Sequence, residues 1–566
     1  MNSLYNELLN VLKTESKYFS EEGEILKNAI YEDSMKMDSS LIKLLLSNEA
    51  CKNHFFTNVD GVLVFDKVGF GWVINNRQFL PDSYTRYKNK IGLVDANENF
   101  ISSSNDVVLS FPYKDCVLEG GQSREEQKKE EIFYNEILAP DEVDSLLYPK
   151  VFSRAKRYTT NGTEENITLN ESDNLIIKGN NLLAISSLLK RYEGKVRLIY
   201  IDPPYNTGND SFRYNDSFNH STWLTFIKNR LEIARRLLAD DGSIYVQLDY
   251  NEVHYFKVLM DEVFGRECFQ REIIWDTQVL SGYKTMVENW IRGHDSILFY
   301  TKKPTGFIFH KQKMPHRKEY LDRFDKVDEN GRKYFDGRGK IRYLDEAIAN
   351  GKPVGDVWYD IMSFQQIPTA KERVAFNTQK PEALLRRIIQ SATNEGDIVL
   401  DFFGGSGTTG VVAHKLKRRY IMCEQIDSQF EIQLERLKTV IDGRDPGSLA
   451  VEINWQGGGS FVYCELAELN QKYIERIEKA ETDDELRLVW KDIQHSGFIS
   501  SYVEPKELGF EDNDFDALSF EDKKRVFLAL LDKNMLYVNY CDMNDETFAI
   551  SEEDKAFTNS FYKKEI

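Results

Sequence analysis

Four consecutive residues, Asp202-Pro203-Pro204-Tyr205, suit a flat ring that carries an exocyclic amino group. The two prolines form a rigid turn and leave carbonyls without competing local N–H donors. Asp202 supplies one hydrogen-bond acceptor and Pro203 supplies a fixed carbonyl. Tyr205 supplies an aromatic ring on which the flat ring can stack. The motif follows the apolar run 196–201, so we expect it at the carboxyl end of a strand, where open sheets bind ligands. A strand-ending turn with a solvent-exposed aspartate is the alternative for this motif alone.

A glycine-rich turn at 401–410, DFFGGSGTTG, is the second candidate. Glycines let the backbone pass close under a ligand, and the N-terminus of the helix that follows presents free N–H groups. Glu424 ends the next predicted strand, 20 residues after Gly404, where a carboxylate can accept both hydroxyls of a ribose. No lysine follows the turn, which excludes a P-loop. A dinucleotide fold, or a tight turn without a ligand, stays open.

Two segments in which strands and helices alternate must position these motifs. The first, 173–265, has strand patterns at 174–179, 196–201 and 243–249 and helical patterns at 222–240 and 252–264. The second, 376–442, has helical patterns at 381–392, 408–417 and 427–441 and strand patterns at 398–403 and 420–425. Such alternation predicts a parallel sheet with helices on both faces. We expect one doubly wound α/β domain, interrupted by an insert.

Composition and charge limit the class of protein. The 566 residues are 41% hydrophobic and 29% charged, which is enough for several domain cores and too apolar for a disordered chain. The net charge of −19 excludes a uniformly basic coat, yet residues 301–380 carry 17 lysines and arginines against 11 acids. Residues 461–566 carry 13 lysines and arginines against 25 acids. This distribution of charge favours an insert that binds phosphates and terminal segments that bind other proteins. Chance clustering of charges on a solvated surface would look similar.

The six cysteines are scattered and form no CxxC or Cys/His cluster. We therefore expect no disulfide framework, no metal site and a reducing compartment, the cytoplasm. The first residues lack the apolar run of a signal peptide, and no run of 18 apolar residues occurs, so no membrane segment is expected.

At its two motifs the chain resembles the S-adenosylmethionine-dependent amino-methyltransferases of DNA. Their signature is a [D/N/S]PP[Y/F/W] loop, here 202–205, and an F-x-G-x-G loop, here 403–407. The DPPY loop comes first, as in the permuted β group of that family, which carries its target-recognition insert between the two halves. Further stretches resemble the modification subunits of Type III restriction–modification systems, namely 79–93, 106–122, 131–152 and 179–218.

The resemblance implies a Rossmann-like methyltransferase fold, S-adenosylmethionine as cofactor, no metal, and N6 of adenine in double-stranded DNA as the target, reached by base flipping. It implies catalytic roles for Asp202, Pro203, Pro204 and Tyr205. It also implies cofactor contacts from Asn180, Lys380, Pro381, Asp401, Phe403, Gly404, Gly405, Gly407 and Glu424. Lys380 and Pro381 belong to a TQKPE element, 378–382, similar to one that contacts the carboxylate end of the cofactor in the family.

The basic block coincides with the expected insert, where we predict DNA contacts from Lys311, Lys313, Arg317, Lys318, Arg332, Lys333, Arg338, Lys340 and Arg342. The resemblance also implies a homodimer and a separate restriction (helicase–nuclease) subunit. Because no GxxxxGK[ST] occurs, we expect the chain to modify DNA without translocating or cutting it. Three alternatives stay open: an orphan adenine-N6 or cytosine-N4 methyltransferase, a DNA-recognition module without turnover, and a Rossmann oxidoreductase, in which DPPY would have no role.

Five segments are expected along the chain: a partly helical N-terminal extension (1–90), the first half of the methyltransferase domain with the DPPY loop (91–265), the target-recognition insert (266–375), the second half with the cofactor loop (376–455), and an acidic C-terminal domain for dimer or partner contacts (456–566).

Overall fold

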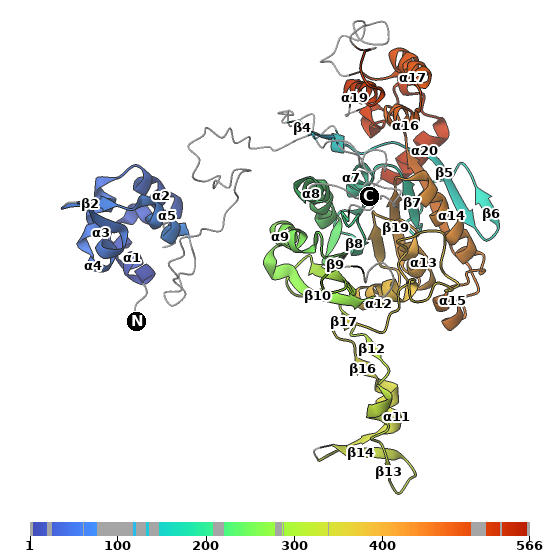
Figure 1. Ribbon diagram of the computed structural model, residues 1–566, viewed down its shortest axis with the longest axis horizontal. Helices are drawn as coiled ribbons and strands as arrows, with labels where there is room; N and C mark the ends of the chain where they lie inside the picture. The colour runs from blue at the N-terminus through green and yellow to red at the C-terminus, as the bar shows by residue number, and fades with distance from the viewer. Residues whose placement is uncertain are drawn as a thin grey trace. The chain divides into compact units, whose positions relative to one another are not determined.

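A computed structural model describes residues 4–19, 25–59, 61–75, 117–119, 132–134, 146–207, 220–277, 286, 288–337, 339–499, 515, 517–532 and 535–562 (Figure 1). The chain divides into two compact units, Met1–Ser110 and Phe111–Ile566. Of the stretches that carry the Type III resemblance, 79–93 lies outside the described residues, as do most of 106–122 and 131–152. None of the described helices is long and apolar enough to cross a membrane.

The N-terminal unit is a small helical body with one β-hairpin. Its core is formed by aliphatic and aromatic side chains, among them Leu8, Phe55 and Phe70, which are almost fully buried. Its described elements are α1 (Leu4–Leu12), α2 (Lys27–Met35), α3 (Ser39–Ser47), α4 (Glu49–Phe55), β1 (Phe56–Val59), β2 (Val62–Phe65) and α5 (Lys67–Asn75). All of them fall within the segment expected to be partly helical.

The second unit is organised by an eleven-stranded sheet in the order β17-β10-β11-β9-β8-β18-β19-β7-β20-β5-β6. Its central strands, from β9 to β20, pair in parallel, whereas β11, β10, β5 and β6 add antiparallel edges. In chain order the strands are β5 (Phe152–Thr159), β6 (Gly162–Glu164), β7 (Leu175–Lys178), β8 (Val196–Ile201), β9 (Leu238–Leu248), β10 (Phe269–Asp276), β11 (His294–Thr301), β17 (Val357–Trp358), β18 (Ile398–Asp401), β19 (Arg419–Glu424) and β20 (Ser460–Leu466).

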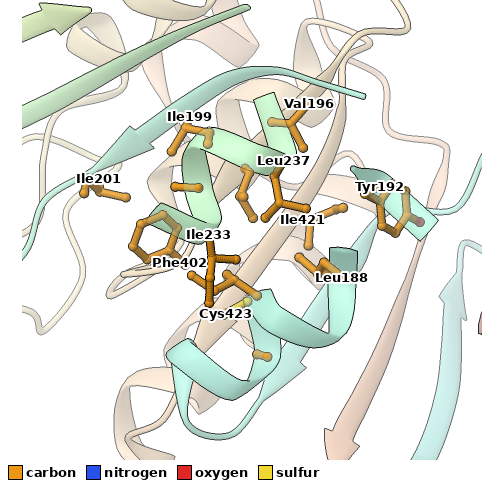
Figure 2. Packing of buried hydrophobic residues seen from close by; sticks show 14 of the residues in the cluster. Leu188, Tyr192, Val196, Ile199, Ile201, Ile233, Leu237, Phe402, Ile421 and Cys423 are labelled. Atoms are coloured by element: carbon orange, nitrogen blue, oxygen red, sulfur yellow. The ribbon is translucent and has the colours of Figure 1, made fainter. Parts of the chain in front are cut away.

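Helices cover both faces of this sheet, because successive side chains of its buried strands point to opposite sides. On β8, Ile199 and Ile201 join one core cluster, whereas Leu198 and Tyr200 join the other. The first cluster packs against α7 (Asn181–Tyr192), α8 (His220–Leu237), α9 (Val253–Phe264) and α20 (Glu552–Tyr562). Figure 2 shows part of it, where side chains from α7, α8, β8 and β19 pack together with Phe402. The second packs against α12 (Glu382–Ala392), α13 (Thr408–Lys415) and α14 (Asp427–Ile441).

These elements confirm the predicted doubly wound α/β class, and the strand and helix patterns predicted in both halves occur close to their expected bounds. Two expected boundaries differ from the structure. The insert was expected to begin at 266, but β10 and β11 extend the sheet. The C-terminal domain was expected from 456, but β20 pairs between β7 and β5. The acidic balance of 461–566 did not indicate this strand, because β20 contains one acid among seven mostly buried residues.

The second unit contains two further groups of elements. Between β11 and β17 lie two short helices, α10 (Lys318–Leu321) and α11 (Leu344–Asn350), and five short strands (Figure 1). The strands β12 (Lys313–Met314) and β16 (Lys352–Pro353) form one small sheet, and β13 (Lys326–Val327), β14 (Lys333–Gly337) and β15 (Lys340–Tyr343) form another. Outside this group lie β3 (Val117–Glu119), β4 (Ile132–Tyr134), α15 (Ser448–Glu452), α16 (Gln471–Lys479), α17 (Asp483–Ser496) and α19 (Phe520–Leu530).

Candidate active site

The two sequence motifs meet in one cavity, because β8 and β18 are neighbouring parallel strands. Asp202 follows the carboxyl end of β8, and Asp401 ends β18, so both loops leave the same edge of the sheet. The cavity between them is lined by residues of both loops and of the TQKPE element: Tyr200, Asp202, Pro203, Pro204, Tyr205, Phe376, Thr378, Lys380, Leu385, Asp401, Phe403, Gly404, Gly405, Ser406, Thr408, Thr409, Glu424, Ile426 and Gln429.

Asp202 is bound by a lysine within this cavity. The ammonium group of Lys380 donates to Oδ2 of Asp202 and lies 5.2 Å from the centre of the Tyr205 ring. Oδ1 of Asp202 is buried and has no hydrogen-bond partner among the described residues. Burial raises the pKa of Asp202, and the positive charge of Lys380 opposes that rise. The DPPY loop therefore presents one occupied and one unoccupied carboxylate oxygen.

A buried polar network holds the other end of the DPPY loop. The Tyr205 hydroxyl donates to Asp295 Oδ2 over 3.4 Å, and the same oxygen accepts from Gln247 Nε2 at 3.0 Å. Arg292 pairs with Asp295, and it also lies 3.2 Å from Asp249 Oδ2. These groups come from β9 and β11 and the turns beside them. The antiparallel pair β9–β11 therefore holds the Tyr205 ring in position.

A further hydrogen bond fixes the prolines. The indole Nε1 of Trp223, on α8, donates to the carbonyl of Pro204 at 2.8 Å. The residue after the motif, Asn206, has a left-handed backbone with φ of 59°. Its side-chain amide donates to Glu252 Oε1 at 2.6 Å. The loop is thereby held from both α8 and the start of α9.

The glycine loop turns tightly beneath the cavity. Gly405 and Gly407 have φ of 49° and 76°, a backbone region that favours glycine. A Cβ at Gly404 would lie 2.6 Å from Gln433 Nε2 and 3.2 Å from the Cys423 carbonyl oxygen. The loop has no room for side chains at this point, as expected where the backbone must approach a ligand.

Two buried carboxylates frame this loop. Burial raises the pKa of Asp401 to about 7, although Thr409 donates to its Oδ2 at 2.5 Å and so stabilises the charged form. Burial likewise raises the pKa of Glu424 to about 6. Glu424 accepts backbone N–H bonds from Gly405 at 2.8 Å and from Ile426 at 3.0 Å. Each carboxylate oxygen has two lone-pair sites, so Glu424 keeps capacity for further donors.

Several residues that sequence reasoning did not select complete the site. Arg436 Nη1, on α14, donates to the Ser406 carbonyl at 2.8 Å and to Thr408 Oγ1 at 2.9 Å, which fixes the end of the glycine loop. Gln429 lines the cavity with a buried side-chain nitrogen that has no partner among the described residues. Neither residue belongs to a recognisable motif, and only their helical spacing on one face of α14 could have indicated them.

Three of the predicted cofactor contacts do not line the cavity. Asn180 caps α7, where its side chain accepts from Leu182 N at 3.0 Å. Pro381 is the residue before α12, and Gly407 is the left-handed residue before α13. Pro381 and Gly407 shape the starts of α12 and α13, which carry lining residues, whereas α7 contributes none of the described lining residues. Lys380, expected at the carboxylate end of the cofactor, lines the cavity and contacts Asp202.

The predicted DNA-binding residues lie on the exposed elements between β11 and β17. Lys311, Lys313, Lys318, Lys333 and Lys340 are exposed, and none forms an ion pair with another described residue. Arg332 differs, because its guanidinium holds Asp345 at 2.8 Å and Glu346 at 3.0 Å. Arg342 donates to the Tyr320 hydroxyl, Arg317 lies 5.2 Å from the Tyr359 ring centre, and Arg338 is outside the described residues.

Residues 196–435 match a family model described as DNA methylase, and residues 38–93 match one described as Type III restriction/modification enzyme methylation subunit. The chain is 34% identical to the probable type III restriction-modification enzyme HindVI Mod subunit of Haemophilus influenzae over 98% of both chains. It is 34% identical to the EcoP15I Mod subunit of Escherichia coli over 27% of this chain and 28% of that protein. The crystal structure of the M1.HpyAVI–SAM complex aligns with 46% of this chain and 98% of its own, at a TM-score of 0.32 and 21% identity.

The sheet and its paired loops, together with the DNA methylase match, define a DNA methyltransferase that uses S-adenosylmethionine. The relative that matches over nearly the whole length makes the family more specific. The chain belongs to the Mod subunits of Type III restriction–modification enzymes.

We predict that Gly404→Asp weakens S-adenosylmethionine binding at least tenfold, about 1.4 kcal/mol, without unfolding the protein. The new side chain would press on Gln433 and the Cys423 carbonyl and place a third carboxylate beside Asp401 and Glu424. Titration calorimetry measures the affinity, and circular dichroism checks the fold. Gly355→Asp is the control, because a Cβ there meets nothing within 4 Å. Equal affinities of the two variants would contradict the assignment of the loop.

Proposed function

We propose that this chain transfers the methyl group of S-adenosylmethionine to N6 of an adenine that has left the DNA duplex, and that it does so as the modification and recognition subunit of a Type III system. The observation that carries the proposal is the Lys380 ammonium. An amino nitrogen already donates to Asp202 and lies over the Tyr205 ring, which is the arrangement that the adenine amino group requires. Lys380 holds one oxygen of Asp202 and leaves the other for the substrate nitrogen.

The cofactor fits the other half of the cavity. We assign Asp401, Phe403, Gly404, Gly405 and Glu424 to its binding, because they line the cavity beside the tightly turned loop. The unpartnered nitrogen of Gln429 and the spare acceptor capacity of Glu424 match a nucleoside, which offers both ring acceptors and ribose hydroxyls. When bound, S-adenosylmethionine supplies a methyl group on a positively charged sulfur.

The protein residues act by orienting the amine. The free oxygen of Asp202 and the Pro203 carbonyl each accept one N–H of N6, which directs the nitrogen lone pair toward the methyl carbon. The N–C bond forms as the S–C bond breaks, the sulfur keeps the electron pair of the broken bond, and one N6 proton passes to solvent. Such positioning can contribute about 7–11 kcal/mol of barrier reduction. Stacking on Tyr205 offsets part of the few kcal/mol needed to extrude the base.

The Type III assignment extends to partners and location. We propose a homodimer that acts in the cytoplasm with a separate restriction subunit, supported by the whole-length similarity to a HindVI Mod subunit. We place target recognition in the elements between β11 and β17, where the exposed lysines gather. The acidic C-terminal segment and the N-terminal extension remain the proposed sites of protein contacts.

The activity is tested by transfer of a radiolabelled methyl group to duplex DNA, followed by identification of the modified nucleoside by mass spectrometry. We expect N6-methyladenine with the wild type and at least a 10²-fold lower rate with Asp202→Ala, because a positioned acceptor is lost. Calorimetry should show retained cofactor binding in that variant. N4-methylcytosine as the product would reject the adenine target, and Asp202→Ala turnover above a tenth of wild type would reject the role of Asp202.

A second prediction concerns pH. Transfer requires ionised Asp202, whose pKa burial raises and Lys380 lowers. Lys380→Met removes the largest contribution that opposes burial, so the pKa of Asp202 rises further and the acid limb of the pH–rate profile moves to higher pH. Lys380→Arg keeps the charge and should restore the wild-type limb. The measurement is the single-turnover rate at saturating cofactor as a function of pH. Overlapping acid limbs for Lys380→Met and wild type would argue against this electrostatic link.

The proposed DNA surface makes a third prediction. Each phosphate contact contributes ~0.9 to the slope of log affinity against log salt. Lys333→Gln and Lys340→Gln should each lower that slope by up to this amount, since these lysines are exposed and unpaired among the described residues. Arg332→Gln is the matched control, because Asp345 and Glu346 already neutralise Arg332. Unchanged slopes for both lysine variants would place the phosphate contacts elsewhere.

A further inference from the structure

A tryptophan stands almost fully in solvent near the proposed target site. Trp290 is 97% exposed, although tryptophan is a large side chain that is usually well buried. Met286 nearby in sequence is 83% exposed, and Tyr250 is 62% exposed. The methyltransferase chemistry described above uses none of the three.

The sheet register places this tryptophan at the edge that carries the site. β11 runs antiparallel to β9, with Ser296 opposite Leu248, and β9 runs parallel to β8, with Val246 opposite Ile201. The start of β11 therefore lies at the carboxyl edge of β8, where the DPPY loop begins. Trp290 precedes β11 by only a few residues, and Tyr250 follows β9 at the same edge.

A chain of ionic contacts ties this position to Tyr205. Arg292, two residues after Trp290, lies 5.8 Å from the centre of the Tyr250 ring and pairs with both Asp249 and Asp295. Asp295 in turn accepts the hydroxyl of Tyr205. The backbone beside the exposed tryptophan is thus anchored to the residue that we propose stacks on the target base.

We propose that Trp290 enters the base stack of duplex DNA as the target adenine leaves it, and that it stacks on the bases beside the gap. The proposal rests on the proposed function. An aromatic plate that projects from an anchored segment beside a base-binding cavity has the shape and chemistry for this role, because base faces stack on aromatic side chains without regard to sequence. Large apolar side chains inserted between base steps are a general means of unstacking a duplex.

The occupant is duplex DNA rather than a protein surface. The continuity with the target-base cavity supports this choice, since DNA that delivers a base to Tyr205 must pass over the same edge of the sheet. Arg292 adds a cation close to Tyr250 on that edge, and Arg stacked on an aromatic ring suits contact with bases and the backbone.

The test compares two duplexes that differ only opposite the target adenine. One has the normal thymine partner, and the other has an abasic position, which removes the pairing that holds the target in the stack. We expect Trp290→Ala to lower the single-turnover methylation rate at least tenfold on the paired duplex and less than threefold on the abasic duplex. Trp290→Phe should retain most of the rate on both.

Two controls make the outcomes decisive. Val451→Ala shortens an apolar side chain that is 76% exposed on α15 and should leave both rates unchanged. Cofactor binding by calorimetry should be equal in all variants. An unchanged Trp290→Ala rate on the paired duplex, or an equal loss on both duplexes, overturns the proposal. So does a changed oligomeric state without a changed rate, which would assign Trp290 to a protein interface. Absence of transfer by the wild type would instead reject the proposed function itself.

Discussion

The parallel pairing of β8 with β18 is the contact on which the site depends. Val399 lies opposite Leu198 and Leu400 opposite Ile199, so two strands almost 200 residues apart in sequence end at the same height. Neither loop makes a site alone. The DPPY loop supplies hydrogen-bond acceptors and an aromatic ring for stacking. The glycine loop supplies a backbone that can approach a ligand closely, next to carboxylates that can accept ribose hydroxyls. Side chains from both faces of the sheet must be fully packed to hold this register, which explains the large buried clusters on each side.

This arrangement concentrates negative charge in a buried place. Asp202, Asp401 and Glu424 all line one cavity, and burial raises the pKa of each. The protein offsets that cost in different ways: with a lysine at Asp202, a threonine hydroxyl at Asp401 and backbone N–H groups at Glu424. Only the first of these partners carries a full charge. The other two are fixed parts of the loop.

Much of this was predictable from local patterns, because periodicity and motif chemistry depend on neighbours in sequence. The bounds 196–201 for β8 and 427–441 for α14 were predicted from the positions of their apolar residues alone. The partners of those elements were not. Lys380 was expected at the cofactor, but its contact with Asp202 depends on how two distant segments meet. Asp295, Gln247 and Arg436 carry no motif at all, and β20 was hidden by the acidic residues around it.

The distance along the chain between the two central strands has a consequence for biosynthesis. β8 ends at Ile201, whereas β18 begins at Ile398. At about 5–20 residues per second, the ribosome needs roughly 10–40 s to deliver the missing strand. During that time β8 has an apolar, hydrogen-bonding edge without its native neighbour, which is the kind of surface that aggregates. β9 can pair with β8 early, but closure of the sheet must wait until the insert has been made. The nascent chain is therefore expected to depend on chaperones until its second half emerges.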